Sequence, residues 1–137
     1  MIRPYELGDV DKLKKVLEPN FFITKTTEEI YHRHPAWTLI KDGEICACGG
    51  CVILWNGVGE IWLTVGENPK RFIKELIKVM RELEEYLIKS YNLVRLHAYV
   101  NSSFKKGIKF ASVFFEKEAI LKKYFPDGND AIIFARY

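Results

Sequence analysis

The sequence lacks the features that mark several protein classes. It has only three cysteines, an odd number confined to residues 46–51, so it offers no disulfide framework and indicates a reducing compartment. The longest uncharged apolar stretch, residues 45–55, is well short of the roughly 20 residues that cross a bilayer. Residues 1–6 show no basic head followed by an apolar segment, so we expect a cytoplasmic protein with no membrane partner.

A strong excess of one charge is also missing. The 21 lysines and arginines are interleaved with 18 aspartates and glutamates, which leaves a net charge of +3 and does not indicate nucleic-acid binding. Hydrophobic residues make up 48% of the 137 residues and aromatic residues 14%, enough for a folded core. We therefore expect a single domain over residues 1–137.

The N-terminal part of the chain predicts one short strand and two helices. Residues 1–5 are typical of a strand, and Asp9 is a candidate N-cap for a helix that Pro19 would end. Thr26 and Glu29 have the spacing of a capping box, in which each side chain satisfies a free backbone N–H of the other. This spacing predicts a second helix with Thr26 as its N-cap.

The middle of the chain predicts three antiparallel strands and a long helix. The strands cover residues 36–41, 44–55 and 58–65, separated by Asp-Gly and Asn-Gly turn dipeptides. Residues 69–90 then carry apolar side chains at helical spacing and contain no glycine or proline after the first turn. We expect one continuous helix there.

The last part predicts a strand over residues 93–100, a helix over 101–112 with Asn101 as N-cap, and a hairpin of residues 117–124 and 131–137. The strand, helix and strand over residues 59–100 form a βαβ unit, so those two strands should be parallel. The expected fold class is α/β (α+β), with a mixed, mostly antiparallel sheet of about seven strands and helices on both faces.

The cysteine spacing raises the question of a zinc site. In a regular strand Cys46 and Cys48 share one face, whereas Cys51 lies opposite unless Gly49 and Gly50 form a bulge. A structural zinc ion usually takes four ligands from turns. We therefore expect buried, reduced thiols and no metal.

Over the whole chain, the order of these elements resembles the GNAT N-acetyltransferase fold. Residues 2–4, the hairpin of residues 39–45 and Asn101 after the fifth strand carry local resemblance. Residues 58–64, the long basic helix and the Asn101 segment are also similar to the phage internal-virion branch of that fold. This second resemblance suggests, as an alternative to an enzyme, a structural component of a phage virion.

The GNAT resemblance implies that acetyl-CoA enters a gap between the fourth and fifth strands. The implied cofactor contacts are Leu63, Thr64 and Val65, whose backbone would pair with pantetheine, Lys70 and Arg71 near the phosphates, and Asn101. The loop of residues 66–73 departs from the family, because it lacks the Gln/Arg-x-x-Gly-x-Gly/Ala signature and carries Pro69. This departure argues against tight acetyl-CoA binding.

The catalytic pattern of the family is half present. Glu60 falls at the place of the carboxylate that acts as general base. His97 shares one side of the fifth strand with Arg95 and Tyr99, and could move protons near neutral pH if that side lines the cleft. The position of the usual tyrosine acid is occupied by Ile108.

Two functional hypotheses follow from these observations. The first is an acyl-CoA-dependent N-acyltransferase that transfers acetyl to a primary amine of a small molecule or protein by direct attack, with a homodimer left open. The second is a GNAT-like scaffold without transferase activity, used in a phage virion or as a protein-binding module.

Overall fold

A computed structural model describes residues 1–18 and 25–137. The strands are β1 (Ile2–Pro4), β2 (Ala36–Lys41), β3 (Glu44–Trp55), β4 (Val58–Val65), β5 (Arg95–Asn101), β6 (Glu116–Leu121) and β7 (Ala131–Arg136). The helices are α1 (Lys25–Arg33), α2 (Ile73–Tyr91) and α3 (Lys105–Phe114), with short 3₁₀ turns at Val10–Lys12 and Pro69–Arg71. None of the described helices is both long and apolar enough to cross a membrane.

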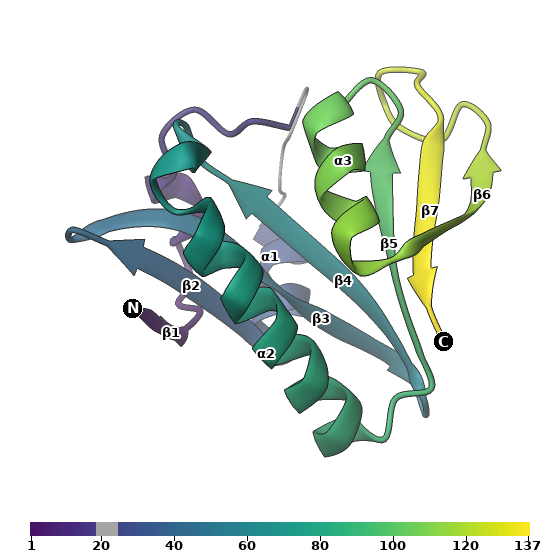
Figure 1. The fold of residues 1–137 in the computed structure, drawn as a ribbon, viewed down its shortest axis with the longest axis horizontal. Coiled ribbons are helices and arrows are strands. Elements are labelled where there is room, and N and C mark those ends of the chain that lie inside the picture. Colours follow the sequence, from purple (N-terminus) through teal and green to yellow (C-terminus); the bar gives the residue numbers. More distant parts are fainter. Residues whose placement is uncertain (19–24) are drawn as a thin grey trace.

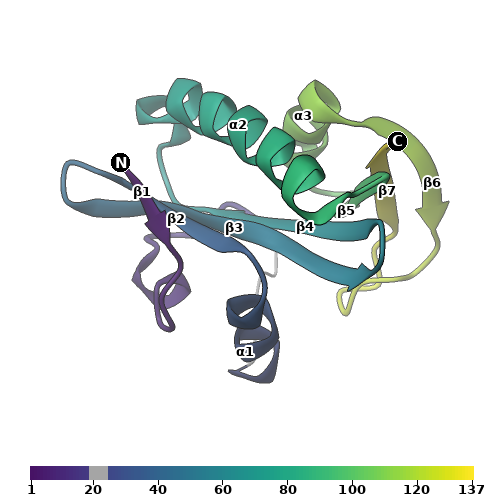
Figure 2. The same ribbon diagram turned by 90° about the horizontal axis from the view of Figure 1, so that it is seen from below.

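All seven strands join one sheet in the order β1-β2-β3-β4-β5-β7-β6 (Figure 1). Every pair is antiparallel except β4 and β5, which are parallel as the βαβ prediction requires. Helices α2 and α3 cover one face of the sheet and α1 covers the other (Figure 2). The predicted fold class is confirmed.

Strands β4 and β5 pair over a short distance and then separate (Figure 1). Only Val58–Arg95, Gly59–Leu96 and Glu60–His97 are in register. Beyond them β4 follows its antiparallel partner β3, while β5 follows β7. The sheet therefore opens after Glu60 because each strand keeps the twist of its own neighbour.

The contact between β4 and β5 depends on a small residue. A methyl group at Gly59 would overlap the Sγ atom of Cys51 and would lie 3.2 Å from Leu96. Cys51 and Leu96 are fully buried in a cluster with side chains from the helical face, including Leu87, Leu93, Ala111, Phe115 and Phe134. The core at the start of β4 thus leaves no room for a side chain at residue 59.

The predicted helix after Asp9 is wrong, because only the 3₁₀ turn Val10–Lys12 forms there. The Asp9 carboxylate caps no helix but accepts hydrogen bonds from Arg3 at 2.8 and 3.0 Å and from Thr38 at 2.6 Å. Burial alone would raise the pKa of Asp9, but these hydrogen bonds hold it below its ordinary value. Pro19, expected to end this helix, lies outside the described residues.

The segment after the turn runs along the end of β4 instead of forming a helix. The backbone N–H of Leu17 donates to the carbonyl of Val65 at 2.9 Å, and that of Glu67 donates to the carbonyl of Lys14 at 2.7 Å. We call residues 13–18 the N-terminal arm. Its backbone N–H and carbonyl groups form hydrogen bonds with the end of β4 and the connection that follows it. These bonds stand in place of the helical hydrogen bonds that the apolar spacing predicted.

Other element boundaries also differ from the sequence predictions. Thr26 lies inside α1, which already begins at Lys25. The long helix is not continuous, because Phe72 has φ −139° and separates the 3₁₀ turn Pro69–Arg71 from α2. Phe72 is fully buried against Leu39 and Cys46, so core packing overrides helical continuity at this residue.

Asn101 is the last residue of β5 and not the N-cap of α3, whose cap position is Phe104. Its side chain accepts hydrogen bonds from the N–H and hydroxyl of Ser103 at 3.0 and 2.8 Å. It also donates to Asp127 at 2.9 Å. The side chain of Asn101, which the sequence assigned to a helix cap, therefore stabilises the turn after β5 instead.

The three cysteines are buried and free, but they lie apart. Leu39 pairs with Ala47 and Ile40 with Ile45, so Cys46 is an extra residue in β3. This bulge puts Cys46 in the cluster against α2, while Cys48 packs with Tyr5 on the opposite face. The expectation of a shared face for Cys46 and Cys48 is therefore wrong. Burial raises the pKa of the Cys48 and Cys51 thiols to about 12.

The packing at Gly59 makes a test of the fold. We expect Gly59→Ala to lower the free energy of unfolding by about 1–3 kcal/mol, the usual cost of overpacking. Cys51→Ala should recover part of this loss, because it removes the Sγ atom that the new methyl group meets. Urea unfolding of both single variants and the double variant measures the coupling. Strictly additive losses would contradict this account of the junction.

Candidate functional site

A cavity of about 460 Å³ opens where β4 and β5 separate. Its walls come from both strands, α3, the start of α2, the N-terminal arm, Tyr31 of α1 and the β6–β7 connection. Because the gap passes through the sheet, the cavity reaches both of its faces. We call it the cleft.

The two faces of the cleft differ in chemistry because side chains alternate along a strand. On the α1 face, Trp62 stacks on Tyr31 at a centroid distance of 4.4 Å, and Tyr99 stacks on Tyr124 at 5.4 Å. We call this side the acidic mouth; its described lining residues include Glu18, Tyr31, Glu60, Trp62, Thr64, Tyr99 and Tyr124.

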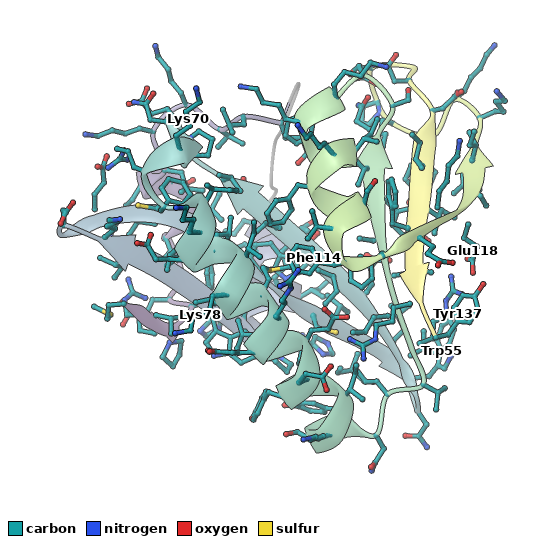
Figure 3. The ribbon with its side chains drawn as sticks, in the orientation of Figure 1. Trp55, Lys70, Lys78, Phe114, Glu118 and Tyr137 are labelled. Carbon is teal, nitrogen blue, oxygen red and sulfur yellow. The ribbon has the colours of Figure 1, made fainter. Side chains whose placement is uncertain are left out.

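The other side of the cleft, facing α2 and α3, is apolar. Leu63 and Val65 pack there with Phe72 and Leu76. Phe114 lies between α3 and α2 (Figure 3). We call this side the apolar mouth; its lining includes Ile61, Leu63, Val65, Ile73, Leu76, Met80, Phe110 and Phe114.

Glu60 lies at the junction of the two mouths. It is the last residue of β4 in register with β5, and it lines the cleft. Its side chain is half-buried, and burial raises the pKa of its carboxyl group above the ordinary value. A carboxylate so placed is a stronger base than an exposed one, as general base catalysis near neutral pH requires.

His97 stands beside Glu60, with its Nε2 atom 3.6 Å from a carboxylate oxygen of Glu60. Its Nδ1 atom accepts a hydrogen bond from Nε of Arg95 at 3.2 Å. Two hydrogen bonds to Glu118, labelled in Figure 3, hold the Arg95 guanidinium. Tyr137 packs its ring on the same guanidinium.

The tautomer of His97 follows from this contact. Arginine can only donate, so Nδ1 must be unprotonated and the ring proton lies on Nε2, facing Glu60. Burial and the charge of Arg95 lower the pKa of His97, which keeps the ring neutral near pH 7. This arrangement favours a role in orienting Glu60 over the proton-carrying role that the sequence suggested.

The predicted cofactor residues on β4 do line the cleft. The backbone N–H of Gly66 donates to the carbonyl of Cys46 in β3. The carbonyl of Val65 points away from β3 and accepts a hydrogen bond from the backbone N–H of Leu17. By strand alternation, the N–H and carbonyl of Leu63 also face the gap. Leu63 thus offers backbone groups to a ligand, while the Val65 carbonyl is already taken by the N-terminal arm.

The predicted phosphate residues are not among those that line the cleft. Lys70 lies beside the start of α2 (Figure 3), and Arg71 pairs with Glu44 at 3.5 Å. Among the described residues, Lys106 of α3 is the one basic side chain in the lining. Ile73 also lines the cleft, so the N–H groups of the first turn of α2 lie at its edge.

Sequence reasoning missed several residues of the acidic mouth, among them Glu18, Tyr31 and Tyr124. Tyr124 follows the β6 strand, and only the antiparallel pairing of β6 with β7 brings it to Tyr99. No motif or spacing signals such a contact. Two buried polar atoms of β4, Trp62 Nε1 and Thr64 Oγ1, also have no hydrogen-bond partner in the described part of the chain.

The tautomer can be measured directly. At pH 7.5 we expect long-range ¹⁵N–¹H spectra to show His97 protonated at Nε2. Arg95→Met should mix the two tautomers and raise the pKa of His97, because it removes both a donor to Nδ1 and a nearby positive charge. Lys122→Met is the control, because it removes a positive charge just after β6 that makes no contact with His97 among the described residues. An Nδ1–H tautomer in the unmodified protein would refute the assignment.

No protein-family model matches the chain, and no curated protein matches its sequence. Ard1 from Thermoplasma volcanium superposes with a TM-score of 0.80 at 17% identity, covering 99% of this chain and 95% of that one. A GNAT family acetyltransferase from Elizabethkingia anophelis with acetyl-CoA bound gives 0.74 at 18% identity, covering 98% and 95%.

The ribosomal-protein-S18-alanine N-acetyltransferase from Escherichia coli gives a TM-score of 0.70 at 21% identity, covering 98% of this chain and 91% of that one. The likeness to these three structures extends over nearly the whole described chain. The separated fourth and fifth strands that the resemblance implied are present as β4 and β5. The chain has the GNAT fold.

Proposed function

We propose that this protein is an N-acyltransferase that moves an acetyl group from acetyl-CoA to a primary amine. The observation that carries the proposal is the position of Glu60, a half-buried carboxylate with a raised pKa at the junction of an acidic and an apolar mouth. One mouth suits an ammonium group and the other an apolar thioester. The acetyl-CoA bound in the Elizabethkingia structure supports this choice of donor.

The apolar mouth fits the pantetheine arm of the donor. Leu63 presents a backbone N–H and carbonyl to the gap, where the amides of pantetheine could pair as a further strand. The start of α2 supplies N–H groups for an anion, with Lys106 and Lys70 as nearby cations. The missing glycines leave fewer free N–H groups, so we expect affinity to come mainly from the pantetheine contacts.

Glu60 would begin the reaction by taking a proton from the ammonium group of the acceptor. The free amine then attacks the thioester carbon, the new C–N bond forms, and the C–S bond breaks to release the thiolate of coenzyme A. The amide nitrogen loses its second proton as the thiolate gains one. His97, neutral and protonated at Nε2, would orient the Glu60 carboxylate through the first step.

Protonation of the thiolate needs an acid. Ile108 packs against the core and has no proton to give. Tyr99 lines the cleft on β5, and burial and the charge of Glu60 raise the pKa of its phenol, which therefore stays protonated at neutral pH. We assign the acid role to Tyr99.

Glu60→Gln is the direct test of the reaction. It keeps the shape of the side chain but removes the base, so kcat should fall by roughly 10²–10⁴-fold. The Kd for acetyl-CoA, measured by calorimetry, should barely change. In the unmodified protein kcat should rise with pH through the raised pKa of Glu60, since only the deprotonated carboxylate is active.

Glu82→Gln, on the exposed side of α2, is the matched control and should keep full activity. Undiminished turnover of Glu60→Gln between pH 6 and 9 would remove Glu60 from the mechanism. Absence of both acetyl-CoA binding and turnover in the unmodified protein would instead favour a non-catalytic scaffold.

A further inference from the structure

We infer that the acceptor is a linear diamine or polyamine, whose second ammonium group binds Glu18 while the reacting amine lies at Glu60. This inference rests on the proposed transfer reaction and adds the class of its acceptor. It is carried by the arrangement of carboxylates, aromatic rings and one unpartnered hydroxyl along the acidic mouth.

Glu18 and Glu60 stand at opposite ends of the acidic mouth. The hydrogen bond from Leu17 to the Val65 carbonyl fixes the N-terminal arm at the far end of β4, and the next residue, Glu18, lines the cleft. Glu60 lies where the gap begins. The strand from Glu60 to Thr64 is about 13 Å long, the length of an extended polyamine rather than of a single ammonium group.

Aromatic rings line the path between the two carboxylates. Tyr31 stacks on Trp62 with an angle of 12° between the ring planes, and Trp62 follows Glu60 on the same face of β4. Burial, followed by the charges of Glu60 and Glu18, raises the pKa of the Tyr31 phenol, so both carboxylates lie near this ring. Such walls suit methylene chains that carry ammonium groups, through apolar and cation–π contact.

Neither carboxylate has a basic partner. In the described part of the chain, no lysine or arginine forms an ion pair with Glu18 or Glu60, and the contact of Glu60 is with neutral His97. Lys106, the basic lining residue, belongs to α3 on the other face of the sheet. A half-buried carboxylate without a counter-ion is costly, so two of them in one mouth indicate a ligand with two positive charges.

Thr64 provides an independent observation. Its side chain is 1% exposed, its Oγ1 atom has no described hydrogen-bond partner, and the residue lines the cleft on the same strand face as Glu60. A buried hydroxyl of this kind requires a partner. An amine of the polyamine near its Glu18 end would donate an N–H to it.

The experiment compares acceptors that differ only in the second charge. Initial rates with acetyl-CoA are measured for spermidine, 1,8-diaminooctane, octylamine and a peptide with neutral side chains and a free N-terminus. We expect kcat/KM for the diamine to exceed that for octylamine by about tenfold or more, since a charged hydrogen bond contributes on that scale. Spermidine should be at least as good as the diamine.

Glu18→Gln should lower the ratio of diamine to octylamine kcat/KM by about tenfold, chiefly through the KM for the diamine. Glu29→Gln, an exposed carboxylate of α1, is the matched control and should keep the ratio. Thermal unfolding of both variants verifies that they remain folded.

The outcomes separate this inference from the proposed function. Equal rates for diamine and octylamine, or the peptide as best acceptor, would overturn the diamine inference while the transferase stands. If no amine is acetylated, the proposed function fails, and calorimetry with spermidine then decides the binding site. Binding that weakens in Glu18→Gln would sustain Glu18 as a polyamine ligand, and absence of binding would overturn it.

Discussion

The short parallel contact between β4 and β5 is the constraint on which the whole site depends. Three residue pairs hold the two halves of the sheet together, and Gly59 belongs to the central pair. Longer pairing would close the gap beside Glu60, whereas shorter pairing would part Glu60 from His97. The tight packing of Gly59 against Cys51 therefore fixes the position of Glu60 in the cleft as well as the core beneath it.

The N-terminal arm closes the other end of the gap. Its anchor is the buried Asp9 carboxylate, which ties β1 to β2 through Arg3 and Thr38. From that anchor the chain reaches β4, where the backbone N–H of Leu17 donates a hydrogen bond to the carbonyl of Val65. The arm thus limits how far a ligand can pair with β4, and it also contributes Glu18 to the acidic mouth.

Most of the strands could be predicted from the sequence because their signals are local. The Asn-Gly turn, alternating apolar residues and the βαβ spacing led to β2, β3, β4 and the parallel β5, and the GNAT resemblance then pointed to Glu60 on β4. The errors came where tertiary packing competes with a local signal. Phe72 fits the helical period but is held in the core, and Asp9 fits a cap but is used in a buried ion pair.

The bulge at Cys46 is a similar case, because nothing in the strand pattern shows which residue lacks a partner. For the site, the sequence led to the β4 residues but not to the residues that face them. Glu18, Tyr31 and Tyr124 come from an arm, a helix and a loop, and their meeting depends on the path of the chain between them. Lys70 and Arg71 were placed by position in a motif whose glycines this chain does not have, and Arg71 pairs with Glu44 instead.

The two mouths open on opposite faces of one sheet, and this has a kinetic consequence. Donor and acceptor would reach Glu60 by separate routes, so neither substrate blocks the entrance of the other. For the proposed transfer, such geometry would impose no compulsory order of addition, and the acetylated amine could depart while coenzyme A is still bound. Double-reciprocal plots would then intersect in the manner of a random sequential mechanism, with each product inhibiting competitively only against the substrate of its own mouth.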